Sequence, residues 1–339
     1  MDYKQSGVDI EAGNEVVRRI RALARSTFTP AVLSEIGSFG GLFRLPPDAG
    51  DRVLVASADG VGTKLKVAFL AGSHGTVGVD LVNHCMNDIL VQGALPLFFL
   101  DYLATGRLRP DVVERVIEGM ARACRENGCA LLGGETAEMP GFYQEGEYDL
   151  AGFIVGIVER ARLIDGSRIA ASDALVALPS SGLHTNGYSL ARQIVFDRLA
   201  LTVDAYVPDI GRTVGEALLE PHRSYLRAIQ PLLQAGLVKG MAHITGGGIT
   251  ENLPRILPPN LAAEINTRSW SIPPLFEWLR RSGQIPIDDM RRTFNLGVGL
   301  IVVCSASDAG RVLEMLKDSG EQPSTIGRIV AGEREVRYT

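Results

Sequence analysis

Residues 59–64 read Asp59-Gly60-Val61-Gly62-Thr63-Lys64 and follow an apolar run, Val53-Leu54-Val55-Ala56, that predicts a buried strand. An acid, two glycines, a hydroxyl and a lysine therefore come at a strand end, where α/β folds bind ligands. Glycines allow close approach of the backbone, and exposed N–H groups can surround an anion. The same residues also fit a solvated glycine-rich turn, and their spacing is not that of a Walker A loop.

The segment 79–92 predicts an amphipathic helix with an unusual polar face. That face carries Asp80, Asn83, His84, Asn87 and Asp88. Short acids and amides suit a rigid site for Mg²⁺ or polar ligand atoms better than they suit bulk water. A helix lining an ordinary polar interface would show the same pattern, and Asp80 would also favour a helix N-terminus electrostatically.

Composition bounds the class of protein. The chain has 339 residues, enough for two ordinary domains, with 46% hydrophobic and 22% charged residues. A net charge of -5 without a basic block argues against nucleic acid as a partner. The four cysteines form no CxxC pair, which favours reduced thiols. The sequence shows neither a signal peptide nor a membrane-spanning run, so we expect a cytoplasmic protein without membrane contact.

Two more strands are predicted to end in acids and glycines. Residues 96–102 include Asp101, and residues 130–132 run into a segment with Gly133, Gly134 and Glu135. We therefore expect the three acids Asp59, Asp101 and Glu135 to lie at the ends of three strands, each with a carboxylate available to a ligand. Further expected elements are helices over 11–24, 110–127 and 308–318, and strands over 149–158, 174–178 and 298–304. A polar stretch at 159–172 predicts a boundary between two α/β domains, residues 1–165 and 166–339.

The second half contains two candidate anion sites. Residues 180–189 predict a strand-to-helix turn dense in hydroxyls, with His184 and Asn186 inside it. Ser181 lacks the surroundings of a nucleophile elbow. Three glycines, Gly246 to Gly248, precede another helix. We interpret His184 as functional because it lies between polar residues of a loop.

Taken in order and spacing, these motifs resemble the phosphoribosylformylglycinamidine cyclo-ligase (aminoimidazole ribonucleotide synthetase) family of purine biosynthesis. The resemblance is nearly end to end and rests on residues 3–4, 7–14, 37–43, 59–64, 79–82, 87–88, 96–102, 133–141, 180–190, 243–248 and 292–299. The segment 220–225 departs from the family pattern, which usually has threonine at the place of His222 and a β-branched residue at that of Ser224.

The resemblance implies two α/β domains and a homodimer in which N-terminal strands close a β-barrel between subunits, with ATP near that interface. It also implies a reaction. ATP phosphorylates the formamide oxygen of formylglycinamidine ribonucleotide, and the amidine nitrogen then closes the ring to give aminoimidazole ribonucleotide, ADP and phosphate. ATP and Mg²⁺ are the implied cofactors.

This resemblance and the residue chemistry together give the candidate site residues. For catalysis they are His184, Lys64 and Asp59. For ATP they are Gly60, Gly62, Thr63, Lys64, Asp80, Asn83, Asp88, Gly133, Gly134, Glu135 and Thr136. For the metal ion they are Asp59, Asp88 and Glu135. For the substrate they are Ser180, Ser181, Gly182, His184, Asn186, His243, Thr245, Gly246, Gly247 and Asn295.

Other functions on the same fold remain alternatives. A selenophosphate synthetase would need a reactive cysteine near the N-terminus, and the first cysteine here is Cys85. Thiamine-monophosphate kinase shares the fold, and formylglycinamidine ribonucleotide synthase would need a source of ammonia that the chain lacks. A silent ATP-binding scaffold would have no need of clustered acids, because like charges repel without a cation.

Overall fold

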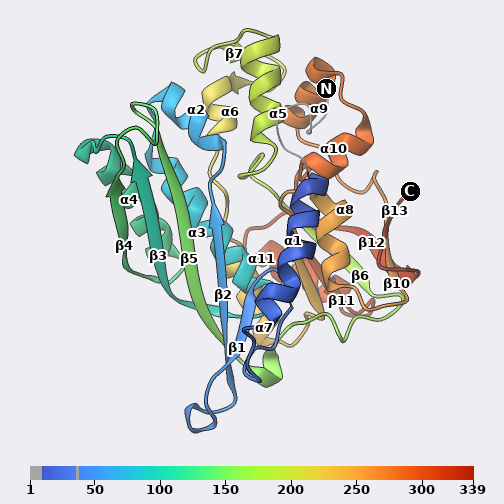
Figure 1. The fold of residues 1–339 in the computed structure, drawn as a ribbon. Coiled ribbons are helices and arrows are strands. Elements are labelled where there is room, and N and C mark those ends of the chain that lie inside the picture. The colour runs from blue at the N-terminus through green and yellow to red at the C-terminus, as the bar shows by residue number, and fades with distance from the viewer. Residues whose placement is uncertain (1–9, 36–37) are drawn as a thin grey trace.

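The computed structural model describes residues 10–35 and 38–339, which form two lobes, each with its own sheet (Figure 1). The first sheet uses residues 41–159 and the second uses residues 174–338. Both lobes combine helices with strands, so the predicted mixed α/β class is confirmed. The division between residues 165 and 166 lies in the connection between the two sheets and stays a prediction. Tyr3, Lys4 and Gly37 lie outside the described residues.

The first sheet is mainly antiparallel. Its strands are β1 (Gly41–Arg44), β2 (Arg52–Gly60), β3 (Leu95–Thr105), β4 (Ala130–Glu138) and β5 (Tyr148–Glu159), in the order β1-β2-β5-β3-β4. Strands β3 and β4 are parallel, and helix α4 (Pro110–Glu126) connects them, as a parallel pair requires. The other neighbouring strands are antiparallel.

The two faces of this sheet have different surroundings. Helices α3 (Gly75–Leu90) and α4 pack on the face that carries Val53, Val55, Phe99 and Ile154. Strand β5 alternates between buried and partly exposed residues, and Phe153 on the other face is 44% exposed. Cross-strand neighbours on that outer face are Leu54, Ala56, Ala58, Leu95, Phe98, Leu100, Tyr102, Ala151, Phe153, Val155 and Ile157. The outer face is therefore an apolar surface in one chain.

Two glycines let α3 and α4 cross at close range. A methyl group at Gly78 would lie 2.1 Å from the Val116 carbonyl oxygen, and one at Gly119 would lie 2.1 Å from the Gly75 carbonyl oxygen. Real side chains do not approach backbone this closely, so any larger residue must separate the helices.

We expect Gly78→Ala to lower the free energy of unfolding by about 1–3 kcal/mol, because overpacking of a rigid contact forces the backbone to shift. Gly310→Ala is the matched control, since a methyl group there meets nothing within 4 Å. Urea unfolding of both variants checks the prediction. Equal stability of the two variants would contradict it.

The second sheet forms the core of the other lobe. Its strands are β6 (Ala174–Pro179), β9 (Gly240–His243), β10 (Leu261–Ile265), β11 (Val298–Cys304), β12 (Ser324–Ala331) and β13 (Val336–Tyr338), in the order β13-β10-β12-β6-β11-β9. Strand β11 is buried along its whole length, because residues on one side face α7 and α11 and those on the other face α8. A short hairpin, β7 (Tyr206–Val207) with β8 (Arg212–Thr213), lies apart from this sheet.

The remaining helices surround the two sheets. They are α1 (Ile10–Arg25), α2 (Lys64–Ala71), α5 (Tyr188–Arg192), α6 (Val214–Leu218), α7 (Leu226–Gln234), α8 (Gly248–Asn252), α9 (Pro274–Gly283), α10 (Ile287–Thr293) and α11 (Ala309–Asp318). Helix α1 lies beside α8 in Figure 1, and Arg255 stacks over the ring of Phe39. Phe39, just before β1, therefore contacts the second lobe.

Most predicted elements are present, but two boundaries matter for the site. Helix α3 begins four residues before the expected start at Val79. Strand β4 continues through Gly133, Gly134 and Glu135, where a loop was expected. Pairing with β3 explains this extension, because tertiary contacts outweigh the weak strand preference of glycine. Asp101 and Glu135 therefore lie inside strands, and the prediction that they stand at strand ends was wrong.

Candidate functional site

The polar face of α3 is buried between the two lobes. Asp80 and Asn87 are 0% exposed, and Asn83, His84 and Asp88 are at most 6% exposed. Asn83 donates to the carbonyl of His222 at 2.7 Å, and Asn87 donates to the carbonyl of Arg223 at 2.9 Å. Asn83 was expected to bind ATP. The structure instead uses both amides to dock the helix on residues 222–225.

Lys64 lies at the start of α2 and is completely buried. Its ammonium group lies 2.9 and 2.8 Å from the two carboxylate oxygens of Asp80. It also donates to the carbonyl oxygens of His184 at 3.1 Å and Glu220 at 2.7 Å. These three partners match the three donors of an ammonium group, so Lys64 and Asp80 link the lobes and offer nothing to a phosphate in this conformation.

Asp59 lies at the accessible edge of the cluster between the lobes. It is the last residue but one of β2, and its side chain is 38% exposed. One carboxylate oxygen accepts from the N–H of Gly60 at 2.7 Å, and the other lies 2.7 Å from Nε2 of His84. Burial opposes the charges of both groups, yet their attraction lowers the pKa of Asp59 and raises the pKa of His84 to about 9. They therefore form an imidazolium–carboxylate pair at neutral pH.

A second histidine–carboxylate pair, His243 with Asp88, lies deeper between the lobes. His243 ends β9, and its Nδ1 is 2.8 Å from Asp88. The other nitrogen of His243 is 3.0 Å from Nε2 of His222, and Asp88 also accepts from the hydroxyl of Ser57 at 3.0 Å. His243 is fully buried. Burial lowers its pKa, although Asp88 works in the opposite direction. His243 was expected to contact substrate, and here it orients Asp88.

His184 occupies the tight turn after β6 with a positive φ of 59°. Its Nε2 accepts from the N–H of Ser181 at 3.1 Å, and its Nδ1 is buried without a partner. Burial, followed by the positive charges of His243 and Lys64, lowers the pKa of His184 well below its usual range. His184 is therefore a neutral imidazole, fully buried under the turn that carries it.

The two predicted anion sites of the second half adjoin. A methyl group at Gly246 would come 3.2 Å from the side-chain oxygen of Asn186. The amide nitrogen of Asn186 is buried without a partner. Asn295 binds Ser180, Gly182 and Gly297, and Ser181 donates to the carbonyl of Pro221. Asn295 and Ser181 thus hold the turn in place, whereas Asn186 has an amide available for a ligand.

Asn252 holds the second turn, residues 245–248, in place by hydrogen bonds. It donates to the carbonyls of Gly246 and Gly248 and accepts from the hydroxyl of Thr245. The candidates Gly246 and Gly247 therefore lie in a fixed loop, with Gly247 in the left-handed region at φ 93°. The sequence analysis did not single out Asn252 for this role. Its position in the first helical turn after three glycines is the signal that could have identified it.

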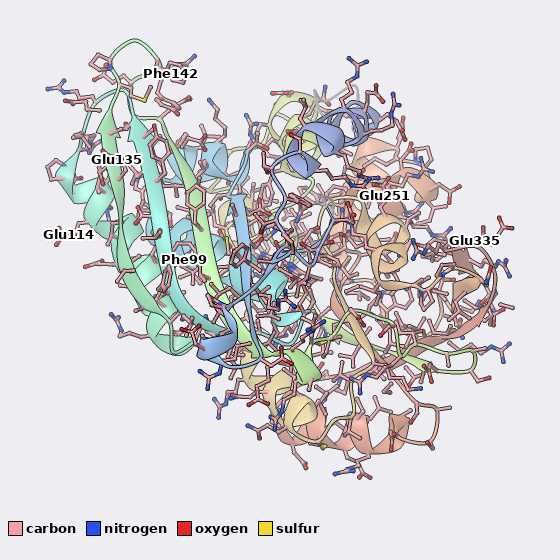
Figure 2. All side chains as sticks on the ribbon, turned by 60° about the horizontal axis from the view of Figure 1, so that its bottom comes forward. Phe99, Glu114, Glu135, Phe142, Glu251 and Glu335 are labelled. Carbon is pink, nitrogen blue, oxygen red and sulfur yellow. The ribbon has the colours of Figure 1, made fainter. Side chains whose placement is uncertain are left out.

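The candidates on β4 lie apart from this cluster. Glu135 pairs with Tyr102 and Tyr102 with Ala151, which places all three on the outer face of the first sheet. Asp59 pairs with Gly152 on the inner face. Figure 2 shows Glu135 on the edge strand of the first lobe, far from Glu251 in the second. One chain does not bring Glu135 together with Asp59 and Asp88 around an ion.

The neighbours of Glu135 on β4 have other surroundings as well. Thr136 is exposed beside it. Gly134 is where the side chain of Asp101 approaches, because a methyl group there would lie 2.3 Å from its carboxylate. Gly133 is exposed on the same strand. These three residues lie with Glu135 on the edge strand and not at the buried cluster.

The first candidate loop keeps a partly accessible backbone. Gly62 has a φ of 68°, and a methyl group there would meet nothing within 4 Å. The hydroxyl of Thr63 is 3.1 Å from that of Ser189 in the other lobe. Residues 60–63 therefore lie between the exposed carboxylate of Asp59 and the turn that contains Asn186.

Within the described part of the chain, no helix is long and apolar enough to cross a membrane.

Comparisons with known proteins identify the relatives of the chain. Residues 38–158 match the model for "AIR synthase related protein, N-terminal domain", and residues 170–339 match the model for the C-terminal domain of the same family. A phosphoribosylformylglycinamidine cyclo-ligase from Trichlorobacter lovleyi is 53% identical and covers 96% of this chain and 94% of its own. Another from Myxococcus xanthus is 55% identical, with 98% and 97% covered.

Solved structures show the same fold at much lower identity. Thiamine-monophosphate kinase from Stenotrophomonas maltophilia gives a TM-score of 0.63 at 21% identity, with 95% of each chain covered. HypE from E. coli gives a TM-score of 0.65 at 19% identity, with 96% of this chain and 93% of its own covered. The two-lobed fold is thus shared with these proteins, while the full-length similarity at about half identity is with one group. The chain belongs to the phosphoribosylformylglycinamidine cyclo-ligase family.

Proposed function

We propose that the protein closes the imidazole ring of aminoimidazole ribonucleotide from formylglycinamidine ribonucleotide, with conversion of ATP to ADP and phosphate. The observation that carries this proposal is the similarity to cyclo-ligases from eight bacteria at 48–55% identity over nearly the whole chain. A departure such as His222 is local and leaves the rest of the pattern intact.

The proposed chemistry has two steps that balance. The formamide oxygen takes the γ-phosphoryl group of ATP, and ADP leaves. The amidine nitrogen then attacks the same carbon, and the oxygen departs as phosphate. Such transfers depend mainly on positioning and on neutralising charge. ATP as the donor is supported by related folds, since structures of T. maritima PurL and of AaThiL are complexes with AMPPCP.

We place the ATP phosphates beside residues 59–63. Asp59 is accessible, and Gly62 leaves its backbone open to a close approach. Mg²⁺ fits this position, because the ion is usually held by one or two carboxylates together with substrate phosphates. Asp59 would be the main ligand of the ion and Asp88 an additional one. The bound ion would neutralise phosphate charge. Lys64 would act by fixing the two lobes rather than by touching phosphate.

We place the substrate at the adjoining turns of the second lobe. The unpartnered amide of Asn186 is a donor for a phosphate or a hydroxyl group. Gly246 lies beside it and keeps the surface open for a ligand. Asn295 and Asn252 act as positioning residues, because their side chains are already bound within the turns. This arrangement puts the substrate across the lobe boundary from Asp59.

The assay that tests the function measures phosphate release and ring formation together. Purified protein is mixed with ATP, Mg²⁺ and formylglycinamidine ribonucleotide, and the product is detected by diazo colour. Equal amounts of phosphate and imidazole, each dependent on the substrate, would support the proposal. Folded protein that binds ATP without turnover on this substrate would instead favour another kinase or synthetase on this fold.

His184 remains our candidate for proton transfer during ring closure, because it is a neutral imidazole with an unpartnered nitrogen. Its burial requires the turn to open around the substrate. We expect His184→Asn to lower kcat by about 100-fold or more, which is the usual contribution of a general acid or base. His74→Asn is the control, since His74 contacts Tyr148 outside this cluster. A change of only a few-fold in His184→Asn would remove His184 from catalysis.

We also propose a homodimer in the cytoplasm, closed through the outer face of the first sheet. The apolar outer face supports this, because exposed patches of this kind commonly mark association surfaces. The candidates on β4, Glu135 and Thr136 among them, would then lie near the subunit boundary and not at the buried histidines. In that arrangement the strands of two chains would cover each other.

We expect Phe153→Asp to shift the protein from dimer to monomer, because a charge would enter the apolar interface. Phe142→Asp is the matched control, because Phe142 is 71% exposed in a loop away from the sheet face (Figure 2). Sedimentation equilibrium measures both variants. A dimer that survives Phe153→Asp would exclude this face as the interface.

A further inference from the structure

Four of the five histidines in the chain gather at one place between the lobes. The ring centroids of His84 and His243 are 5.2 Å apart, and those of His222 and His243 are 5.1 Å apart. His184 stacks on His222 at 3.9 Å. All four are at most 4% exposed. The ring-closing chemistry proposed above uses only one of these imidazoles, so the others need a different explanation.

Three side chains in this cluster have the composition of a metal site. His84, Asp88 and His243 each offer a ligand atom, and these atoms lie within 4.8 Å of one another. His84 and Asp88 are one turn apart on α3, so they share a face of that helix. His243 approaches from the end of β9. Two imidazoles and one carboxylate are a ligand set that proteins use for divalent transition ions.

Each of the three ligands is held by an outer partner. Nδ1 of His84 is 2.7 Å from the hydroxyl of Thr185. Nε2 of His243 is 3.0 Å from His222, and Asp88 accepts from Ser57 at 3.0 Å. Metal-binding histidines commonly have such a partner on their other nitrogen, which fixes the ring and its tautomer. The inner atoms, Nε2 of His84 and Nδ1 of His243, are the two now paired with carboxylates.

We propose that His84, Asp88 and His243 bind a divalent transition ion of the Zn²⁺ and Co²⁺ class. Asp59 contacts His84 at the accessible end of the cluster and offers a fourth ligand and a route of entry. The ion takes the place of the protons that each histidine now shares with a carboxylate. Imidazole nitrogens favour these ions over Mg²⁺, which prefers oxygen ligands.

The neighbouring set of His184, His222 and His243 is a poorer site. The rings of His184 and His222 are stacked with 21° between their planes. Lone pairs of imidazole lie in the ring plane, so those of two stacked rings lie in nearly parallel planes and do not converge on one ion. His222 serves better as the outer partner of His243.

Binding at this site has a consequence for the proposed function, with which it shares Asp59 and Asp88. A transition ion bound by Asp88 and the two histidines takes a carboxylate away from Mg²⁺ and ATP. Zn²⁺ should therefore inhibit turnover in competition with Mg²⁺. The binding itself needs neither nucleotide nor substrate, so it is measured independently of whether the ring-closing activity is correct.

The test is a titration of the full-length, nucleotide-free protein with Co²⁺, followed by visible absorption. We expect one Co²⁺ per chain, with absorption bands of a site containing nitrogen ligands. His84→Asn and Asp88→Asn should each weaken Co²⁺ binding at least about tenfold. His74→Asn, which removes the one histidine outside the cluster, should bind Co²⁺ like the unaltered protein.

Several outcomes would overturn the proposal. The unaltered protein could show no Co²⁺ absorption, or His84→Asn and Asp88→Asn could both bind with unchanged affinity. Circular dichroism melts establish that each variant is folded. If one of them does not fold, Thr185→Val tests the same site through the outer partner of His84, and unchanged affinity in that variant and in the remaining ligand variant overturns the proposal.

Discussion

Lys64→Met is expected to destabilise the protein by about 3–5 kcal/mol, which is the usual result of removing one partner from a buried ion pair. The substitution would leave the carboxylate of Asp80 without its cation at a position that is 0% exposed. It would also leave the carbonyl oxygens of His184 and Glu220 without the donor that they now share. The loss should therefore weaken both the first lobe and its contact with the second.

Lys66→Met provides a control two residues along the same helix. The side chain of Lys66 is 39% exposed, and it pairs with Glu147 near the surface. Such pairs contribute about 0–1 kcal/mol. Urea unfolding at pH 7 should therefore distinguish the two methionine variants clearly.

A double variant tests whether the pair itself is responsible. Burial lowers the pKa of Lys64 and raises the pKa of Asp80, and their mutual attraction opposes both shifts. In Lys64→Met with Asp80→Asn, the uncompensated charge is gone, while the amide oxygen can still accept from the N–H of His222. We expect the double variant to be more stable than Lys64→Met. Equal or lower stability would show that packing, not charge, explains the loss.

The role of Lys64 shows what the sequence could and could not predict. The strand before it and the glycines around it were predictable from apolar patterning and backbone freedom. From the sequence, a lysine after a glycine turn could bind a phosphate or pair with a buried carboxylate, and its neighbours do not distinguish the two roles. Only the packing of α2 against the second lobe decides between them, and that packing joins residues 120 and 156 positions apart in sequence.

The polar face of α3 leads to the same conclusion. Its amphipathic pattern predicted a helix, and a helix is present. Short acids, amides and a histidine could face a ligand or another lobe, and both alternatives were open. Asn83 and Asn87 face the backbone of residues 222–225, while His84 and Asp88 face the histidine cluster. The periodicity fixes which residues share a face but not what lies opposite it.

The continuation of β4 through Gly133 and Gly134 could not be predicted from the sequence for a different reason. Glycine, acid and threonine in sequence have low strand preference, so the local signal favoured a loop. The register with β3 overrides it, and Gly134 is required because the side chain of Asp101 lies against it. The motif that carried the resemblance to the family is thus part of a sheet edge. Sequence alone gave the family but not the face on which these residues lie.

Stability should depend on pH through His84. Burial opposes its protonation, but the charge and hydrogen bond of Asp59 raise its pKa from 6.5 to about 9. The folded protein therefore holds this proton more tightly than the unfolded chain. The resulting stabilisation is complete below pH 6.5 and is lost as pH rises through 9. At about 1.4 kcal/mol for each pKa unit, it amounts to about 3 kcal/mol.

The measurement is urea unfolding between pH 6 and pH 10, compared between the unaltered protein and His84→Gln. The difference in unfolding free energy isolates His84 from other groups that titrate in this range. We expect the difference to shrink by about 3 kcal/mol across the interval. His74→Gln is the control, because burial and the charge of Arg115 lower the pKa of His74, so its difference should stay constant above pH 7.

The other histidines of the cluster act in the opposite sense. Burial lowers the pKa values of His184, His222 and His243, so the unfolded chain takes up protons that the folded protein excludes. Their contribution is present above pH 6.5 and is lost as pH falls below that value. Loss on both sides places the stability maximum near pH 6.5, because the contribution of His84 already declines between pH 6.5 and pH 9. A nuclear magnetic resonance titration of His84 would decide the matter directly, since a midpoint near 6.5 in the folded protein contradicts the pairing with Asp59, and a midpoint near 9 that falls in Asp59→Asn establishes it.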